Sequence, residues 1–253
     1  MRKITIRNKS FNVEEGHEDF WEKFESEIWE KTTLDIFDSY IDEDTCFLDI
    51  GSWMGPTALY AALLARKVIC IEADPVAHTQ LQKNIALNPL INQKISVINK
   101  AISSTENSVR MGARYAQGDS MSSILFASDE NFWVLPAITP KQIISEIQCD
   151  FKKYFIKIDI EGGEYTLMPH LHHFIELKNN IFFISLHPKF VEKNPFIRFF
   201  KMGYKTQKAL FPFKNYKVSL VDNHTITFAP LITLLVKLGI CYIPIKSSLL
   251  LHK

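Results

Sequence analysis

A short loop that begins and ends with glycine, Gly51–Gly55, constrains the fold of this chain more than any other feature. It follows the apolar run Cys46–Ile50, which is typical of a buried parallel strand, and precedes the apolar helical stretch Thr57–Arg66. Glycine tolerates a positive φ and lets a ligand approach the backbone closely. Pro56 lies at the first helical position, where its missing N–H costs nothing. The chain therefore turns sharply from a strand into a helix whose N-terminus faces the loop.

A second apolar run, Val68–Ile71, completes a strand–helix–strand unit. It ends at Glu72, and Asp74 is the expected N-cap of a helix over Pro75–Asn88. Glu72 follows the loop at the offset of about 20 residues at which an acidic side chain meets a nucleotide ribose in such units. One carboxylate can accept hydrogen bonds from both ribose hydroxyls. These residues predict a cofactor with a nucleoside part beside the loop.

The loop itself argues against a dinucleotide. A G-x-G-x-x-G turn lets the backbone approach a pyrophosphate, but Trp53 stands where the second glycine would be. Trp53 and Pro56 therefore argue against a nicotinamide-dependent oxidoreductase, which is the alternative enzyme class. The loop matches the D-x-G-x-x-x-G pattern of class I S-adenosylmethionine-dependent methyltransferases, whose cofactor has an adenosine and an amino acid but no phosphate.

Over roughly residues 20 to 190 the chain resembles the FkbM-type methyltransferases. The matching segments are Trp29-Glu30, Asp49–Gly55, Ile71–Ala77, Leu81–Asn88, Asn99–Ser103 and Lys157–Glu164. Each motif is short, but their order and spacing together are specific. The resemblance implies a doubly wound, mostly parallel, seven-stranded Rossmann-like α/β sheet with one antiparallel strand and helices on both faces. It also implies S-adenosylmethionine as the cofactor.

Strands and helices alternate from Thr45 onward, as in a parallel sheet covered on both faces. Residues 103–137 break this pattern with polar turns and predict an antiparallel excursion beside the cofactor pocket. The further strands expected are Ile95–Asn99, Phe155–Ile160, Ile181–Leu186, Tyr204–Lys208 and Thr225–Phe228, and the further helices are Glu164–His173 and Phe196–Lys201.

Three parts are expected along the chain: an N-terminal cap of a hairpin and helices over residues 1–44, a class I methyltransferase domain over 45–229, and an apolar C-terminal extension over 230–253. Aromatic side chains at helical spacing in the cap are expected to dock on the core. Lys237, Gly239 and Pro244 interrupt the extension, whereas a bilayer span needs about 20 continuous apolar residues. A packed terminal element or a homodimer contact is favoured, and a segment on a membrane surface is the minor alternative.

The charge, the cysteines and the N-terminal residues argue against nucleic acid binding, a zinc site, a disulfide framework and secretion. The 29 Lys and Arg residues against 28 Asp and Glu residues leave a net charge of +1, so no overall field recruits nucleic acid. Cys46 and Cys70 fall in expected core strands, far from Cys149 and Cys241, which predicts neither a zinc site nor a disulfide framework. The N-terminal basic residues have no apolar stretch behind them, so a cytoplasmic protein is expected.

Candidate site residues lie at the carboxyl ends of the strands, where open α/β sheets bind ligands. Three carboxylates, Asp159, Glu161 and Glu164, follow one strand within six residues. Asp159 is expected to face the pocket and pair with the ammonium group of the cofactor, whereas an acid at a helix N-terminus, such as Glu164, is favoured by the helix dipole. His187 follows the next strand and is either a general base or a hydrogen-bonded loop residue, two interpretations with equal weight.

The candidate bases are Glu161 and His187, and Lys157 is expected to orient either of them. A metal site formed by Asp159, Glu161 and His187 is the less favoured interpretation, because their spacing is not diagnostic, and no metal is expected. The predicted cofactor residues are Glu30, Asp49, Gly51, Ser52, Trp53, Met54, Gly55, Thr57, Glu72, Ala73, Asp74, Ala101 and Asp159.

The expected reaction is in-line displacement of a methyl group from a sulfonium by a hydroxyl or an amide, with catalysis mostly by positioning. The favoured acceptor is a hydroxyl of a sugar, another small molecule or a natural product. N-methylation of a peptide side-chain amide is the alternative. A non-catalytic binding module with the same fold is a third hypothesis, against which the presence of Asp49, Glu72 and Asp159 argues.

Overall fold

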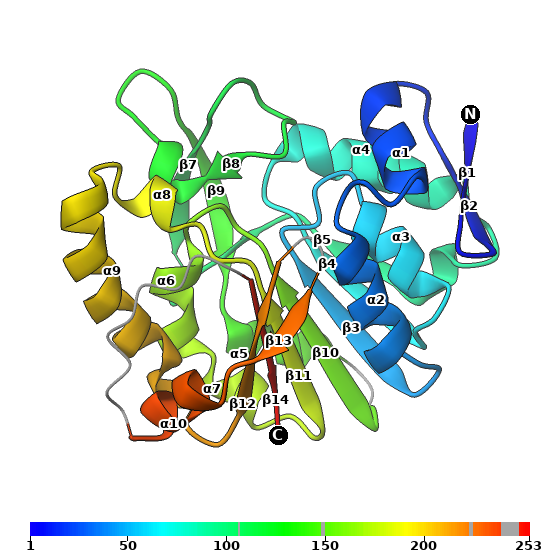
Figure 1. Ribbon diagram of the computed structural model, residues 1–253. Helices are drawn as coiled ribbons and strands as arrows, with labels where there is room; N and C mark the ends of the chain where they lie inside the picture. Colours follow the sequence, from blue (N-terminus) through cyan, green and yellow to red (C-terminus); the bar gives the residue numbers. More distant parts are fainter. Residues whose placement is uncertain (106, 148–149, 223–224, 239–247) are drawn as a thin grey trace.

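A mostly parallel β-sheet with helices on both faces forms the core of the protein in the computed structural model (Figure 1). The structure describes residues 1–105, 107–147, 150–222, 225–238 and 248–253. Eight strands lie in the order β13-β12-β14-β11-β10-β3-β4-β5. The expected doubly wound α/β class is therefore confirmed. Cys149, Gly239, Cys241 and Pro244 lie outside the described residues.

Five parallel strands form the central part of the sheet. In spatial order they are β5 (Ile95–Ile98), β4 (Lys67–Ile71), β3 (Thr45–Ile50), β10 (Lys153–Ile158) and β11 (Asn180–Ile184). Every residue of β3 is buried, as expected for a strand covered on both faces. Successive side chains point to opposite faces, so Phe47 and Leu48 belong to two different hydrophobic clusters. The carboxyl ends of all five strands consequently meet at one edge of the sheet.

The other end of the sheet comes from the last part of the chain. β14 (Ser248–His252) lies between β11 and β12 (Lys217–Val221) and is antiparallel to both, so β12 runs in the same direction as β11. These seven strands form the expected sheet with one antiparallel strand, although β12 and β14 were not among the strands predicted from the sequence. β13 (Ile226–Phe228) adds an eighth, antiparallel strand at the exposed edge. The apolar C-terminal stretch thus contains α10 (Pro230–Leu238) and ends in a strand inside the sheet.

The strand predicted over Tyr204–Lys208 is wrong, because this segment is part of the helix α9 (Pro195–Leu210). The side chain of Asn194 caps the helix by accepting hydrogen bonds from two backbone N–H groups. Met202 and Ala209 are both buried, two helical turns apart. The helical spacing of buried residues extends well beyond the predicted helix Phe196–Lys201.

The helix predicted over Glu164–His173 is divided into three short elements. They are α6 (Glu164–Leu167), a 3-10 turn (Met168–His170) and α7 (His172–Ile175). Pro169 lies in the middle of the segment and has no backbone N–H to continue the helical hydrogen bonds. The strand before it, β10, also ends two residues earlier than predicted, which frees Asp159 from the sheet.

Helices cover both faces of the sheet (Figure 1). The cluster on one face includes side chains of α1 (Glu18–Glu25), α2 (Lys31–Tyr40), α3 (Pro56–Ala62) and α4 (Pro75–Ala86). The cluster on the other face includes side chains of α5 (Pro140–Glu146), α6, α7, α9 and α10. The remaining short elements are α8 (Pro188–Val191) and the 3-10 turns Asn92–Lys94, Ile124–Phe126 and Phe211–Phe213.

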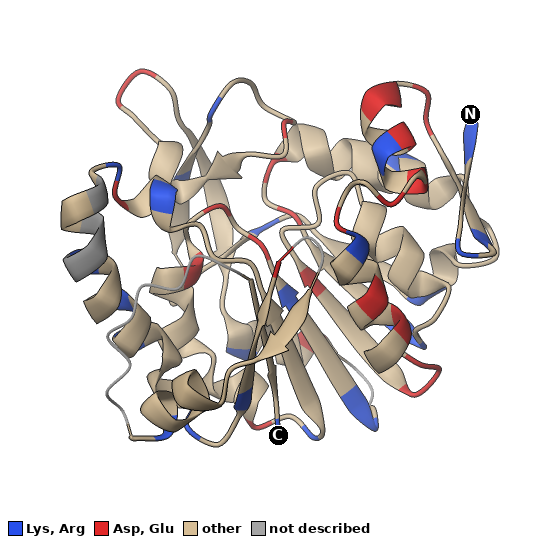
Figure 2. Cartoon of the chain, viewed as in Figure 1, with Lys and Arg blue, Asp and Glu red and all other residues tan. Residues whose placement is uncertain are grey.

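Residues 1–44 form a hairpin, β1 (Arg2–Ile6) and β2 (Lys9–Val13), followed by α1 and α2. Trp21 and Phe24 of α1 are buried and pack edge-on against Phe11 of the hairpin. Arg7 forms ion pairs with Glu27, which follows α1, and with Asp35 and Asp38 of α2. Lys, Arg, Asp and Glu are interspersed over the molecule (Figure 2), in keeping with its small net charge.

The excursion predicted over residues 103–137 is a small sheet with the order β6-β9-β7-β8. Its strands are β6 (Ala101–Ile102), β7 (Ser108–Ala113), β8 (Ser122–Ser123) and β9 (Trp133–Ile138). β7 pairs antiparallel with β8 and β9, as predicted, while β6 and β9 are parallel. The excursion stands beyond the carboxyl ends of the main strands (Figure 1). No helix among the described residues has the length and apolarity needed to cross a membrane.

Candidate functional site

A cavity of about 110 Å³ lies at the carboxyl ends of β3, β4 and β10, between the glycine loop and the excursion. Side chains and backbone from both sides line it, so the excursion forms one wall. The predicted site residues that line it are Gly51, Trp53, Glu72, Ala73, Ala101, Asp159 and Glu161. Residues far apart in the sequence therefore meet here, as the strand-end argument predicts.

The glycine loop forms the floor of this cavity. Gly51 has φ +82°, and a Cβ atom at this position would lie 1.9 Å from the carbonyl oxygen of Asp159. Gly55, with φ +92°, precedes the first turn of α3. Trp53 also adopts a left-handed conformation, with φ +49°. Gly51 is therefore required for two reasons, its φ and the close approach of the next strand end.

Glu72 faces the cavity with its carboxylate held by two backbone groups. Its Oε2 accepts a hydrogen bond from the N–H of Trp53 at 2.7 Å, and its Oε1 accepts one from the N–H of Asp74 at 2.8 Å. Burial raises the pKa of Glu72 to about 7, although both backbone hydrogen bonds act to lower it. Each carboxylate oxygen keeps a lone pair that can accept a hydrogen bond from a hydroxyl of a ligand.

Asp49 and Lys157 form a buried ion pair beneath the loop. Lys157 Nζ lies 3.1 Å from Asp49 Oδ1 and also donates to the carbonyl of Gly51 at 3.4 Å. Burial lowers the pKa of Lys157, but the charges of Asp49, Asp159 and Glu30 outweigh this effect and raise it. Burial raises the pKa of Asp49, although the charge of Lys157 acts to lower it. The bonds of Lys157 thus support the loop, whereas the sequence predicted that it would orient Glu161 or His187.

Several predicted cofactor residues lie behind the cavity wall instead of in it. Asp49 Oδ2 accepts a hydrogen bond from the hydroxyl of Thr57 at 2.8 Å. The Ser52 hydroxyl donates to the carbonyl of Asp49 at 2.8 Å, and Asn84 of α4 donates to the carbonyl of Met54 at 2.9 Å. Asp49, Ser52, Met54, Gly55 and Thr57 thus hold the loop in shape. The structure does not place them among the described residues that line the cavity.

Asp74 joins the cofactor-side helix to the excursion. Its Oδ1 accepts hydrogen bonds from Val76 and Ala77, which is the N-cap that the sequence predicted. Its Oδ2 accepts hydrogen bonds from the N–H of Gly118 at 2.8 Å and the hydroxyl of Ser122 at 2.7 Å. These four bonds give Asp74 a scaffolding position outside the cavity lining, although it was predicted among the cofactor residues.

The excursion contributes cavity residues that sequence reasoning missed. Trp53 donates a hydrogen bond from its indole nitrogen to the carbonyl of Gly118 at 3.0 Å and so ties the loop to the excursion. The only local signal was a polar, glycine-containing stretch, which identifies a turn but not its neighbours. The missed residues that line the cavity include Ser103, Met111, Asp119, Ser120, Ser122, Ser123 and Ile124.

Glu30 lies at a second, smaller cavity of about 60 Å³, together with Thr33, Ser185 and Ser248. It adopts φ +49° and accepts a hydrogen bond from the hydroxyl of Thr33 at 3.0 Å. Burial and the charge of Asp159 raise the pKa of Glu30 to about 7. This predicted cofactor residue is therefore placed beside a different cavity from the one that Glu72 lines.

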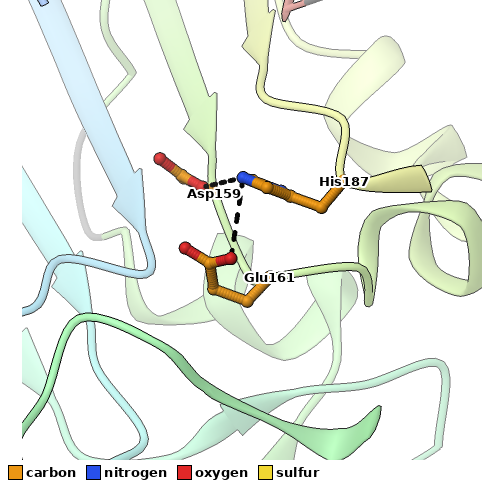
Figure 3. A group of neighbouring side chains, drawn as sticks. All are labelled: Asp159, Glu161 and His187. Atoms are coloured by element: carbon orange, nitrogen blue, oxygen red, sulfur yellow. Dashed lines mark ion pairs between the residues drawn. The ribbon is translucent and has the colours of Figure 1, made fainter. Parts of the chain in front are cut away.

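Beyond the ends of β10 and β11, three side chains converge (Figure 3). His187 Nε2 lies 3.7 Å from Asp159 Oδ1 and 3.6 Å from Glu161 Oε2. On the other side of the ring, His187 Nδ1 lies 3.0 Å from Oε1 of Glu164, which is fully buried. Glu164 is fixed in turn by hydrogen bonds from the backbone N–H groups of Ile160 and Gly162.

Negative charge dominates this group. Burial alone lowers the pKa of His187, but the hydrogen bond to Glu164 and the charges of Asp159 and Glu161 raise it to about 9. Burial raises the pKa of Glu161 to about 7, with the charge of Asp159 acting in the same direction. The carboxylates at this edge of the sheet therefore favour a positive charge among them.

Comparisons with known proteins give distant structural similarities. No protein-family model matches the chain, and no curated protein matches it in sequence. Among solved structures, it is similar to the methyltransferase FkbM from Methylobacillus flagellatus, with 15% identity and a TM-score of 0.47 over 93% of this chain and 60% of that one. It is also similar to a precorrin-6y C5,15-methyltransferase from Geobacter metallireducens, with 10% identity and a TM-score of 0.41 over 95% of this chain and 91% of that one.

Proposed function

We propose that this protein is an S-adenosylmethionine-dependent methyltransferase that transfers a methyl group to a hydroxyl of a sugar or another small molecule. One observation carries the proposal: a single cavity is lined by Glu72 and Ala101 on one side and by Asp159 and Glu161 on the other. An acid suited to a ribose and an acid suited to an amino group thus face one space above a glycine loop.

The residues present fit such a cofactor. Glu72 is held by two backbone N–H groups with lone pairs left for the two ribose hydroxyls. The backbone at Ala101 lines the cavity where an adenine would lie beside it. Asp159 lines the same cavity beside the glycine loop, so its carboxylate can pair with the ammonium group. When bound, the cofactor supplies an electrophilic methyl group on a sulfonium.

Glu161 is the proposed base, because it lines the cavity, whereas His187 stands behind it against Glu164. In the transfer, the acceptor oxygen forms a bond to the methyl carbon as the sulfur–carbon bond breaks. The hydroxyl proton passes to the Glu161 carboxylate, which keeps the charges balanced. The other residues of the cavity position the acceptor and exclude water, which is the main source of rate enhancement in such displacements.

Binding and turnover can be measured separately. Calorimetry with S-adenosylhomocysteine is expected to give one binding site in the native protein and a loss of affinity of at least tenfold in Glu72→Ala. Glu43→Gln changes an exposed acid far from the cavity lining and serves as the control. Absence of binding in the native protein would contradict the proposed function.

The acceptor class is tested by incubation with isotopically labelled S-adenosylmethionine and a panel of saccharides, small phenols and alcohols, and peptides. Mass spectrometry of the products locates the methyl group. A methyl group on oxygen supports the proposal, whereas a methyl group on an amide nitrogen would replace it with the N-methylation alternative.

A further inference from the structure

We propose that Asp159, Glu161 and His187 bind a divalent metal cation beside the acceptor position. One ligand atom from each residue lies within 4.8 Å of the other two. Two of these side chains line the cavity, so a cation there borders the space proposed for the acceptor. The role of the cation in catalysis rests on the proposed function, whereas its binding does not.

The spacing of the three atoms suits ligands better than mutual hydrogen bonds. His187 Nε2 is 3.7 Å from Asp159 Oδ1 and 3.6 Å from Glu161 Oε2 (Figure 3). Both distances exceed the 2.7–3.2 Å typical of N–H···O hydrogen bonds. Ligands that each lie about 2.1 Å from one ion are separated from each other by about 3.0–3.5 Å. A shift of a few tenths of an ångström therefore brings His187 Nε2 and either oxygen to the spacing of two ligands of one ion.

Two of the proposed ligand atoms lack any other partner in the described part of the chain. Asp159 Oδ1 and Glu161 Oε2 are each buried and have no hydrogen bond. Buried polar atoms without a partner are rare in folded proteins, and each requires an explanation. Here both atoms point toward the same imidazole nitrogen (Figure 3). A cation between them satisfies the two oxygens and the nitrogen together.

The surroundings of His187 fix the orientation that a metal ligand needs. A carboxylate only accepts hydrogen bonds, so Glu164 Oε1 at 3.0 Å keeps a proton on Nδ1, and Nε2 is the nitrogen that can exchange its proton for a cation. The ring of Phe190 stacks on that of His187, with an angle of 8° between the planes. Such carboxylate–histidine pairs behind a ligand nitrogen are common at metal sites.

The backbone of Glu161 adopts an unusual, left-handed conformation. Glu161 has φ +53°, a left-handed conformation that is strained for a residue with a side chain, and Gly162 follows it with φ +98°. Lys157 lies at the opposite end of Asp159, with its Nζ 3.9 Å from Oδ2. Asp159 therefore presents Oδ1 to the proposed cation and Oδ2 to the side of the glycine loop, where the amino group of the cofactor is proposed.

Two carboxylates and one imidazole suit cations of the Mn²⁺ and Mg²⁺ class, which take oxygen ligands and keep open positions for water or substrate. Asp159 and Glu161 line the cavity, so a ligand in the cavity can reach the cation. A cation lowers the pKa of a hydroxyl that binds to it. Glu161 Oε2 serves the cation, and Oε1 of the same carboxylate is left to receive the proton.

Manganese alone is a direct probe of this site. Native protein treated with a chelator and dialysed is titrated with MnCl₂, with free Mn²⁺ followed by electron paramagnetic resonance. One bound ion per chain is expected. Asp159→Asn and Glu161→Gln are each expected to weaken binding at least tenfold, and Glu164→Gln to weaken it about tenfold through the orientation of His187. Glu43→Gln is the matched control and is expected to bind as the native protein does.

A second measurement identifies the nitrogen ligand without relying on affinity. Electron spin-echo modulation from a ¹⁴N nucleus is expected in the Mn²⁺ complex of the native protein and is expected to disappear in His187→Gln. Absence of bound Mn²⁺, or binding that is unchanged in both Asp159→Asn and Glu161→Gln, would overturn the metal site. Binding of S-adenosylhomocysteine measured with chelator present tests the proposed function separately, so failure of one proposal is distinguishable from failure of the other.

Discussion

The backbone N–H of Trp53 donates a hydrogen bond to Oε2 of Glu72 at 2.7 Å. This contact joins the glycine loop to the acid at the end of the next strand, so the two halves of the predicted cofactor site are held in one arrangement before any ligand binds. Because Trp53 also bonds Gly118 through its indole nitrogen, the same residue fixes the position of the excursion.

The affinity for S-adenosylhomocysteine is expected to increase with pH through the ionisation of Glu72. Its pKa of about 7 means that the ionised fraction rises from about one tenth at pH 6 to about nine tenths at pH 8, and only the ionised carboxylate can accept hydrogen bonds from both ribose hydroxyls. Calorimetry at these two pH values should show an approximately ninefold increase in affinity. Glu72→Gln should lose this component while Glu43→Gln keeps it. Equal pH dependence in Glu72→Gln would contradict the assigned role.

Glu161→Gln is expected to lower kcat by about 10²–10⁴-fold, because the amide cannot receive the acceptor proton. The affinity for S-adenosylhomocysteine, measured with chelator present, should change less than twofold, since Glu161 lies on the acceptor side of the cavity. Initial rates of S-adenosylhomocysteine formation with an accepted substrate provide the measurement. A variant that keeps more than half of the native kcat would exclude Glu161 as the base.

Lys157→Met is expected to destabilise the protein by about 3–5 kcal/mol, because it leaves Asp49 buried without its cationic partner. Asp49→Asn in the same chain removes the uncompensated charge and should restore a large part of that loss. Urea denaturation of the native protein, the two single variants and the double variant gives the coupling energy. A double variant whose loss equals the sum of the two single losses would show that the pair is not coupled.

Gly51→Ala is expected to destabilise the protein by more than about 3 kcal/mol, since the new Cβ atom would overlap the carbonyl of Asp159. Gly16→Ala is the matched control. Gly16 also has a positive φ, +108°, but apart from its two chain neighbours no heavy atom lies within 4 Å of a Cβ built there. Its expected cost is about 1 kcal/mol, from backbone strain alone. Similar melting temperatures for the two variants would argue against the close approach at Gly51.

Asp74→Ala is expected to release the excursion, because Gly118 and Ser122 lose their shared acceptor. The lost helix cap accounts for about 1 kcal/mol of global stability. Limited proteolysis should cleave between residues 114 and 122 at least tenfold faster than in the native protein. Thr139→Ala removes the cap of α5 and controls for the loss of a cap alone. Equal cleavage rates in these two variants would refute the proposed link.

The parallel half of the fold could be predicted because its signals are local. The run before Gly51, the run before Glu72 and the acid-rich end of β10 each combine an apolar strand with a polar terminus within a few residues. β14 was missed because Leu249–Leu251 is short and apolar on both sides, and its pairing partners lie many residues away. Nothing in that stretch alone distinguishes a central strand from a packed tail.

In the candidate site, too, some residues could be predicted from local sequence and others depend on tertiary contacts. Glu72 and Asp159 follow from strand ends, and the structure places both at the cavity. The positions of Asp119 and Ser123 depend on how the excursion folds back over the loop, which no local pattern encodes. Asp74 and Lys157 stand out in the sequence, but their partners, Gly118 and Asp49, become apparent only from the tertiary contacts.

The place of β14 in the sheet has a consequence for biosynthesis. The strand between β11 and β12 is the last of the eight to leave the ribosome, so until it emerges β11 has a free edge of unpaired backbone groups. The nascent chain can form its ligand-side half early, yet it stays prone to pairing with other chains until synthesis reaches Ser248–His252. Pairing of β14 with β11 and β12 is therefore the step that closes the most aggregation-prone edge of the sheet.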